Sequence, residues 1–225
     1  MAYNLNDKLV IAISSRALFD LEEENQIFEK DGLDAYYKYQ LENQDKSLKK
    51  GTGYRLVENI LKINSFFSSD ERQVEVIILS KNNAATSLRI TNAINDLKLD
   101  IIRSAWTSGT NISNYLKAFK VDLFLSADDN DVLNAIENGV AAAKILHSNE
   151  NINNSSNNQV RIAFDGDAVL FSEESELVYK NHGLEAFIEH EKENRNNPLE
   201  MGPFAKLLLT IAKIQAKFPT DKSPI

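Results

Sequence analysis

The sequence predicts an α/β fold in which a Rossmann-like parallel sheet carries helices on both faces, and it predicts this fold twice in tandem. Short apolar runs of strand composition alternate with longer stretches whose apolar residues recur at helical spacing. This alternation is typical of parallel sheets covered by crossover helices. In addition, the chain matches itself when residue 8 is laid on residue 159, a shift of 151 positions.

Composition restricts the class of protein. The chain has 225 residues, 43% of them hydrophobic, with no cysteine and a net charge of −8. Without cysteine there are no disulfides, thiolate zinc sites or cysteine nucleophiles, which fits a reducing compartment. The acidic balance argues against a nucleic-acid polymer as partner, because phosphate backbones are bound by clustered lysine and arginine. We find no signal peptide and no apolar stretch near the ~20 residues that span a bilayer, so we expect a cytoplasmic protein without membrane contact.

Four strands are expected in the first part of the chain, each followed by a helical stretch. By apolar and β-branched composition these strands are 9–13, 74–79, 101–102 and 121–125. By helical spacing, the helices are about 21–43, about 54–67, one around 88–94, one around 115–119, and about 132–146. Polar residues follow the strands, and the run 126–131 is expected to cap the last of these helices.

A polar stretch, 149–158, divides the chain. It has no hydrophobic periodicity that could build a core, and we expect it to be a linker. It separates a first copy, 1–148, from a second copy, 159–225. Identities at the shift of 151 include Ile11 with Ile162, Gly32-Leu33 with Gly183-Leu184, and Gly51 with Gly202. Duplication is the simplest explanation, and the second copy is then incomplete, since residue 225 corresponds to residue 74, where the next strand would begin.

Most of the recognisable chemistry lies in the second copy, at 161–171. An apolar run, expected as a buried strand, ends in Asp165 and Asp167. Side chains alternate along a strand, so both carboxylates should leave on one side, where they can share a divalent cation and a phosphate. Gly166 between them would let backbone and ligand approach closely. Taken alone, Asp-Gly-Asp is often only a turn with glycine at positive φ. The first copy has Ser-Ser-Arg at the same positions, 14–16, and lacks both carboxylates.

Several segments carry a family resemblance. They are AISSRALF at 12–19, SAD at 126–128, GVAAA at 139–143 and, above all, AFDGDAVLFS at 163–172, extended by GL at 183–184, Phe187, EHEK at 189–192 and PL at 198–199. Over nearly the whole chain they resemble the cytosolic 5′-nucleotidase I family of haloacid-dehalogenase-like phosphatases. The resemblance implies a haloacid-dehalogenase-like fold. It also implies magnesium-dependent hydrolysis of nucleoside 5′-monophosphates to nucleoside and phosphate.

The resemblance also implies roles for the two carboxylates. Asp165 would attack phosphorus and form an aspartyl-phosphate, which divides one difficult displacement into two easier ones. Asp167 would protonate the departing ribose oxygen and then take a proton from the hydrolytic water. The Asp165 carboxylate and the Asp167 backbone carbonyl would hold Mg²⁺, which neutralises charge on the phosphoryl group.

The family continues beyond the position of residue 225 into further phosphate- and magnesium-binding segments. The first copy offers substitutes at the matching points of its own fold: Ser80, Lys117, Asp128 and Asp129. A composite site would form if the strand before Asp165 docked beside them. Simpler roles are open for all four, namely a helix cap for the serine, a solvated helix face for the lysine, and the first turn of a helix for the aspartates.

Two functions from different classes therefore stay open. The first is a magnesium-dependent 5′-nucleotidase. The second is a non-catalytic nucleotide-binding or regulatory module derived from such an enzyme, which the degenerate first copy and the absent family segments favour. An incomplete second copy would also expose a sheet edge, through which the chain could pair with another copy and form a homo-oligomer.

Overall fold

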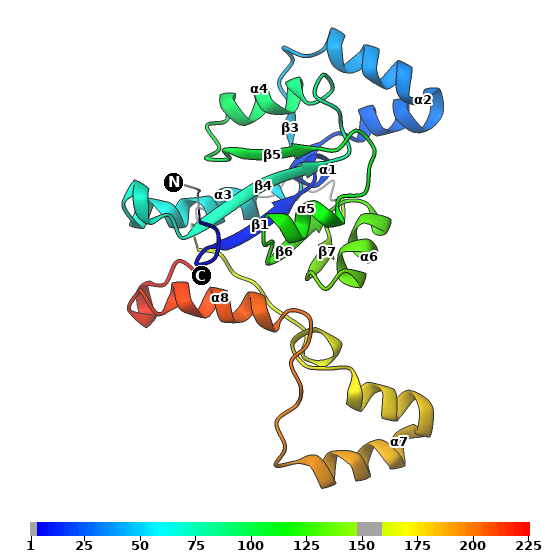
Figure 1. The fold of residues 1–225 in the computed structure, drawn as a ribbon, viewed down its shortest axis with the longest axis vertical. Coiled ribbons are helices and arrows are strands. Elements are labelled where there is room, and N and C mark those ends of the chain that lie inside the picture. Colours follow the sequence, from blue (N-terminus) through cyan, green and yellow to red (C-terminus); the bar gives the residue numbers. More distant parts are fainter. Residues whose placement is uncertain (1–3, 148–158) are drawn as a thin grey trace. The chain divides into compact units, whose positions relative to one another are not determined.

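The computed structural model describes residues 4–147 and 159–225 (Figure 1). These residues form two compact units. The first unit comprises the described residues up to Val160 together with Pro224, and the second comprises Arg161–Ser223 with Ile225. The predicted linker, 149–158, lies outside the described residues.

The first unit is built on a five-stranded parallel sheet, which confirms the α/β class. Its strand order is β5-β4-β1-β6-β7. The strands are β1 (Leu9–Ile13), β4 (Val74–Ser80), β5 (Arg103–Trp106), β6 (Leu123–Ser126) and β7 (Ala142–Lys144). In register, Leu9 pairs with Val74 on one side of β1, and Ile11 pairs with Leu123 on the other. Strand β1 therefore lies in the middle of the sheet, with β4 and β5 on one side and β6 and β7 on the other.

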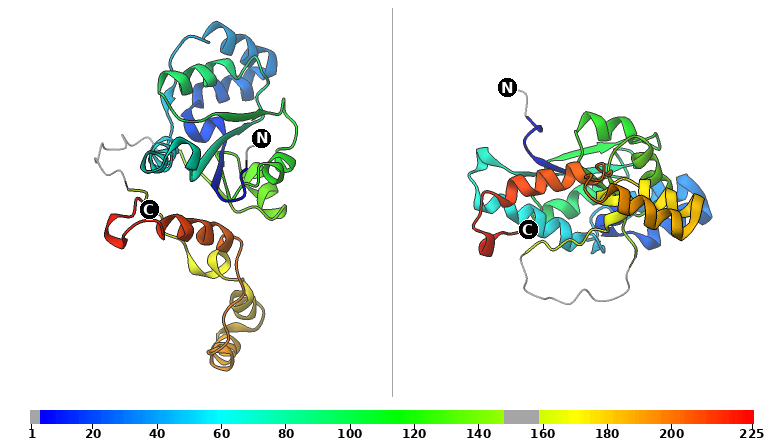
Figure 2. Two further views of the ribbon diagram at one scale, coloured as in Figure 1. Left: turned by 60° about the vertical axis from the view of Figure 1, so that its left-hand side comes forward. Right: turned by 90° about the horizontal axis from the view of Figure 1, so that it is seen from below.

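Helices flank this sheet. They are α1 (Ser15–Leu18), α2 (Glu22–Glu42), α3 (Tyr54–Lys62), α4 (Leu88–Asp96), α5 (Ser113–Ala118) and α6 (Asp129–Glu137), with short 3₁₀ turns η1 (Ile63–Phe66) and η2 (Ser69–Glu71). A small antiparallel pair, β2 (Phe19–Asp20) and β3 (Lys49–Lys50), precedes α3. The helix α2 folds back on itself at a break, as the left view of Figure 2 shows.

The core explains why the central strands are so apolar. All of β1 and β4 is buried, and strands covered on both faces read as nearly continuous hydrophobic runs. On one face, Val10 and Ala12 pack in a cluster with Leu116 of α5 and Ala135 of α6. The charged exception is Glu75 of β4, whose fully buried carboxylate forms ion pairs with Arg103 and Arg72. A buried charge is tolerated when it is paired in this way.

Two predicted elements of the first unit are wrong. The expected strand 101–102 is displaced to 103–106, and the helix expected over 132–146 ends at Glu137. Gly139 then takes a positive φ of 76°, which turns the chain back toward the sheet. The following residues form β7 and extend the sheet beside β6.

The second unit contains helices and one isolated antiparallel bridge. Its elements are a single π-helical turn, η3 (Gly166–Leu170), the helices α7 (Glu174–Asn194) and α8 (Ala205–Gln215), and a 3₁₀ turn, η4 (Thr220–Lys222). The strand predicted before Asp165 does not form, and residues 161–163 are exposed rather than buried. The physical reason is pairing. Strand β1 has neighbours on both sides, whereas among the described residues no strand lies along 160–164, where Val160 donates one backbone hydrogen bond, 2.8 Å long, to Pro224.

The two units share local geometry at the shift of 151 residues. Helices α2 and α7 are both 21 residues long, and both break at a glycine with nearly the same backbone angles, φ 84° and ψ −176° at Gly32 and φ 82° and ψ −177° at Gly183. An edge-to-face aromatic pair spans each break. Its ring centroids lie 5.9 Å apart in the pair Phe28–Tyr36 and 6.1 Å apart in the pair Tyr179–Phe187.

The match extends to the end of the chain. The side chain of Asn64 donates to the carbonyl of Val74 at 2.9 Å, and the side chain of Gln215 donates to that of Ile225 at 3.1 Å. The bond from Val160 to Pro224 corresponds to the bond from Leu9 to Gln73, which is 2.9 Å long. Equivalent positions thus make equivalent contacts.

Candidate functional site

Asp165 lies in the second unit, at the start of η3. Its backbone is extended, with φ −68° and ψ 156°, and its carboxylate accepts a hydrogen bond of 2.7 Å from the N–H of Gly166. The side chain is exposed. Asp167 falls inside η3, and its side chain lies outside what the structure describes. π-Helical turns are rare and are often found at functional sites.

Gly166 does not behave as the sequence suggested. It does not adopt a positive φ, so the turn that Asp-Gly-Asp often forms is not the one found here. A Cβ at this position would have its nearest neighbour, a ring carbon of Phe171, at 3.8 Å, which is ordinary contact. The protein's own packing therefore does not require glycine at position 166, and any close approach there would have to come from a ligand.

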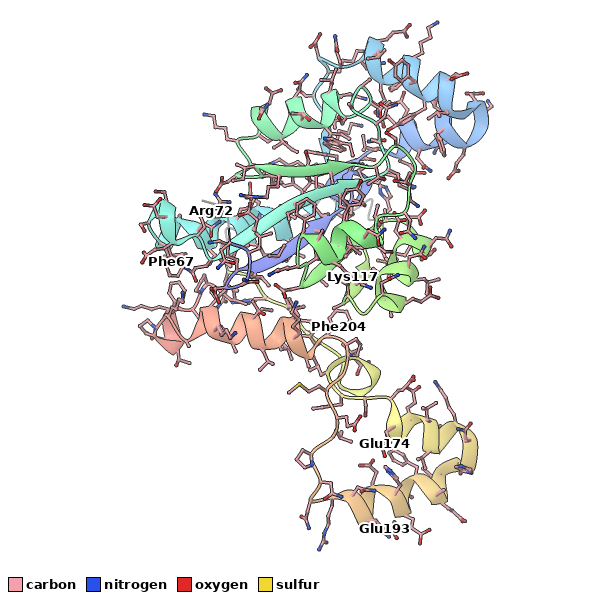
Figure 3. The ribbon with its side chains drawn as sticks, in the orientation of Figure 1. Phe67, Arg72, Lys117, Glu174, Glu193 and Phe204 are labelled. Carbon is pink, nitrogen blue, oxygen red and sulfur yellow. The ribbon has the colours of Figure 1, made fainter. Side chains whose placement is uncertain are left out.

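The backbone after the motif is firmly held. Gly202 donates to the carbonyl of Leu170 at 2.9 Å, and Phe204 donates to that of Val169 at 3.1 Å. A Cβ at Gly202 would lie 2.4 Å from the carbonyl oxygen of Phe171, so the two backbone segments touch. Figure 3 labels Phe204, which immediately precedes α8. The segment before α8 thus fixes the far end of η3.

The donor set at the motif fits magnesium. In proteins Mg²⁺ is usually bound by one or two carboxylates, with water and substrate phosphate completing its shell. Asp165 presents such a carboxylate at an exposed position, with one oxygen engaged by a backbone N–H. Among the residues that the structure describes, no group of three or more histidine, cysteine or acidic side chains gathers to form an all-protein cage. The arrangement thus suits an ion shared with substrate.

Three of the four candidates from the first copy lie at the carboxyl edge of its sheet. Ser80 ends β4, and its hydroxyl lies 3.1 Å from that of Ser15. Asp128 caps α6 by accepting from the N–H of Asp131 at 3.0 Å, and Asp129 forms a 2.7 Å ion pair with Lys144. Each of these side chains thus has a structural partner.

Lys117 is placed differently. It is the residue before the last in α5, a helix that runs away from the carboxyl edge of the sheet (Figure 3). Its ammonium group donates to the side chain of Asn138 at 3.2 Å. It is exposed. The structure therefore brings Ser80, Asp128 and Asp129 to one edge but not Lys117. A composite site that joins these residues to Asp165 stays a prediction.

Tyr36 of α2 ties the helical hairpin to the loop after β4. Its hydroxyl donates to the side chain of Asn82 at 2.9 Å and accepts from Gln40 at 3.0 Å. Burial raises the pKa of the Tyr36 hydroxyl, while its two hydrogen bonds oppose the shift. The group therefore stays protonated and remains a donor over the neutral range.

A cleft of about 330 Å³ lies at the same edge of the first unit, and nothing in the sequence indicated it. Ionisable residues contribute to its lining from three segments: Arg16 after β1, Asp20 and Glu22 around the start of α2, and Lys144 and His147 at and after the end of β7. Residues far apart in the chain form this cleft, so no local pattern could have revealed it.

Each helix within residues 4–147 and 159–225 is too short or too polar to span a bilayer.

Comparison with known proteins identifies relatives of the chain. A family model described as 5′-nucleotidase matches residues 1–225. Among curated proteins, human cytosolic 5′-nucleotidase 1B is 34% identical over 214 residues, which is 93% of this chain and 35% of the relative. The chain thus spans about a third of the length of that relative. No solved structure matches.

Proposed function

The chain belongs to the 5′-nucleotidase family, and from this membership we propose that it hydrolyses nucleoside 5′-monophosphates to nucleoside and phosphate. The observation that carries the proposal is the exposed carboxylate of Asp165. One of its oxygens is oriented by the Gly166 N–H, which leaves the other for attack on phosphorus. Nucleophile and proton donor would come from a segment whose far end is held by backbone hydrogen bonds.

The reaction would proceed in two displacements. In the first, a carboxylate oxygen of Asp165 forms a bond to phosphorus while the bond from phosphorus to the ribose 5′-oxygen breaks, and Asp167 gives that oxygen a proton. In the second, Asp167 takes a proton from water, the water oxygen bonds to phosphorus, and the bond to Asp165 breaks. Asp165 and Asp167 return to their starting states, so the cycle balances.

Asp165, through its carboxylate, and Asp167, through its backbone carbonyl, would hold Mg²⁺. The ion supplies positive charge that offsets the dianionic phosphate beside two carboxylates. Ser80, Asp128 and Asp129 remain candidates for additional phosphate or metal contacts, and Lys117 is the weakest of the four because of its place on α5.

We also propose that the chain is a tandem duplication, with copies at 1–148 and 159–225 joined by 149–158, each of haloacid-dehalogenase-like type. The matched helix breaks at Gly32 and Gly183 and the matched aromatic pairs support it. The second copy would carry the reaction, while the first retains the scaffold without the two carboxylates. A cytoplasmic location and a homo-oligomeric state are part of the same proposal.

A second function is favoured by one observation. At the shift of 151 residues the first unit has Ser14 and Arg16 in place of Asp165 and Asp167. A unit without the two carboxylates could bind nucleotide without turning it over, as a regulatory module.

A single assay separates the two functions. Phosphate release from the four common nucleoside 5′-monophosphates would be measured with magnesium and with EDTA. We expect magnesium-dependent turnover that falls by about 10³-fold or more in Asp165→Asn and in the double variant with Asp167→Asn, because the nucleophile is lost. The exposed Asp34→Asn serves as matched control and should retain turnover. Unchanged activity in Asp165→Asn would remove the mechanism, and calorimetric binding without turnover in the unaltered chain would favour the regulatory module.

A further inference from the structure

The cleft of the first unit lies where an open α/β sheet binds ligands. From β1 the sheet grows through β4 in one direction and through β6 in the other. Crevices form outside the carboxyl ends of the strands at such a switch point. Arg16 follows β1, Ala127 follows β6 and Ile145 follows β7, and all three line the cleft. Its position alone thus marks the cleft as a candidate binding site.

At the two motif positions the negative charge of the second unit is replaced in the first unit. At the shift of 151 residues, Ser14 takes the place of Asp165, and Arg16 takes the place of Asp167. A carboxylate pair needs a divalent cation before it can accept a phosphate, whereas a guanidinium binds phosphate directly and often through two parallel hydrogen bonds. The hydroxyl of Ser14 is largely buried and accepts from the N–H of Ala17. At these two positions the first unit therefore has a group that can bind an anion directly, and it has no carboxylate.

Arg16 is engaged only loosely within the protein. Its guanidinium lies 3.9 Å from the carboxylate of Glu22, and the two side chains are 37% and 47% exposed. An exposed pair at this distance contributes little stability and is readily exchanged for another anion. Lys144, by contrast, is held by Asp129 at 2.7 Å. Arg16 is thus the residue of the cleft best placed to take a phosphate.

The remaining walls select the kind of phosphate compound. Ile145 and the exposed Leu146 offer apolar surface for a base, and the volume of about 330 Å³ is at the lower end of the range of small-molecule pockets. Asp20 and Glu22 also line the cleft. The Asp20 carboxylate can accept hydrogen bonds from ribose hydroxyls, and both carboxylates repel additional phosphate groups. The cleft therefore suits a monophosphate better than a di- or triphosphate.

We propose that this cleft is a second, metal-independent nucleotide site, in which Arg16 binds the phosphate of a nucleoside 5′-monophosphate that is not hydrolysed there. The choice of a nucleotide, rather than another phosphate ester, rests on the proposed nucleotidase function. The charge replacement and the cleft itself do not depend on it.

The test is calorimetric titration of the full chain carrying Asp165→Asn and Asp167→Asn, in EDTA, with the four nucleoside 5′-monophosphates and with inorganic phosphate and the free nucleosides as comparisons. We expect saturable binding of at least one monophosphate, weaker binding of inorganic phosphate, and none of the nucleoside. Arg16→Gln should weaken binding about tenfold or more. Glu22→Gln should strengthen it, because a competitor for the guanidinium is removed. The exposed Arg195→Gln is the matched control and should bind like its parent.

Two results would overturn the proposal: no metal-free binding by the parent chain, or equal binding by the parent and Arg16→Gln. If Arg16→Gln fails to fold, as judged by circular dichroism, the Glu22→Gln variant decides, since unchanged affinity there excludes a role for the guanidinium. A failure of the proposed nucleotidase function would be detected by a different measurement. It would appear as no magnesium-dependent turnover in the unaltered chain, whether or not a monophosphate binds in EDTA.

Discussion

One arginine connects segments that are far apart in the chain. Arg89 of α4 lies 2.5 Å from the carboxylate of Glu24 in α2, and the two side chains are only 8% and 6% exposed. The same guanidinium donates to the backbone carbonyl of Lys46 at 3.1 Å. It thereby anchors both the beginning of the helical hairpin and the segment that follows it.

Removal of this arginine should be costly. In Arg89→Ala the carboxylate of Glu24 would stay buried without its partner, so we expect the free energy of unfolding to fall by about 3–5 kcal/mol in urea denaturation at neutral pH. The exposed pair Lys38–Glu42, whose side chains are 76% and 62% exposed, provides the control. There, Lys38→Ala should cost about 1 kcal/mol or less.

The double variant Arg89→Met with Glu24→Gln removes both charges and should recover part of the loss. If Arg89→Ala costs no more than Lys38→Ala, the pair does not hold the hairpin. Nothing in the sequence indicated this pair. The run Glu22–Glu24 looks like an ordinary solvated helix start, and only the packing of α2 against α4 distinguishes Glu24 from its two neighbours.

At the scale of elements, the breaks in α2 and α7 depend on glycine. A φ near +83° with ψ near 180° belongs to a region of backbone space that is essentially restricted to glycine. Around both Gly32 and Gly183 a Cβ would meet nothing within 4 Å. Backbone conformation alone, rather than crowding, therefore requires glycine at these two positions.

We expect Gly32→Ala and Gly183→Ala each to lower stability by about 1–3 kcal/mol, measured as the free energy of unfolding from circular dichroism melts. Gly166→Ala is the matched control, since that residue has no positive φ and has room for a Cβ. Its melt should coincide with that of the unaltered chain. A loss in the control as large as in the two variants would contradict the conformational explanation.

The sequence predicted elements well where a local run of residues is enough to indicate whether the element is buried. Strand β1 occupies 9–13 as expected, because a continuous apolar run fits only the middle of a covered sheet. The prediction failed at 160–164, where an apolar run interrupted by Arg161 has no neighbouring strand among the described residues. Strand β7 was not predicted because its three residues continue the helical spacing of the preceding segment. Only Gly139 interrupts that spacing.

For the whole molecule, the similarity between positions 151 residues apart predicts that paired positions behave alike. A Cβ at Gly51 would lie 2.7 Å from the carbonyl carbon of Phe19, and one at Gly202 would lie 2.4 Å from the carbonyl oxygen of Phe171. Both obstacles are backbone atoms, which cannot move aside cheaply. The two glycines are equivalent at the shift of 151 residues, and each closes the same kind of loop in its own unit.

We expect Gly51→Ala and Gly202→Ala each to cost about 1–3 kcal/mol, the usual range for overpacking. Hydrogen exchange followed by mass spectrometry would show where the loss occurs. Protection should fall around 17–20 and 51–57 in the first variant, and around 168–172 and 202–208 in the second. A uniform loss over both units, or no change in Gly202→Ala, would contradict equivalent roles.

Internal similarity was visible in the sequence because identities at a fixed shift need no structure to be counted. The cleft was not, because its lining comes from segments around 16–22, 51–52, 127 and 144–147. Only the order of strands in the sheet brings these segments together. The motif at Asp165 was likewise found by composition, whereas the π-helical turn that follows it was not.

The buried carboxylate of Glu75 has an implication for how this chain could diverge. It lies at the second residue of β4, toward the amino end of the strand and opposite the rim where Arg16 and Ser80 lie. A slip of one residue would turn Glu75 away from Arg103 and Arg72, so this charge cluster locks the strand alignment. Mutations at the carboxyl edge of the sheet can then accumulate without changing how the strands pair. An ancestral catalytic centre could be erased and a different ligand adopted while the underlying framework is inherited unchanged.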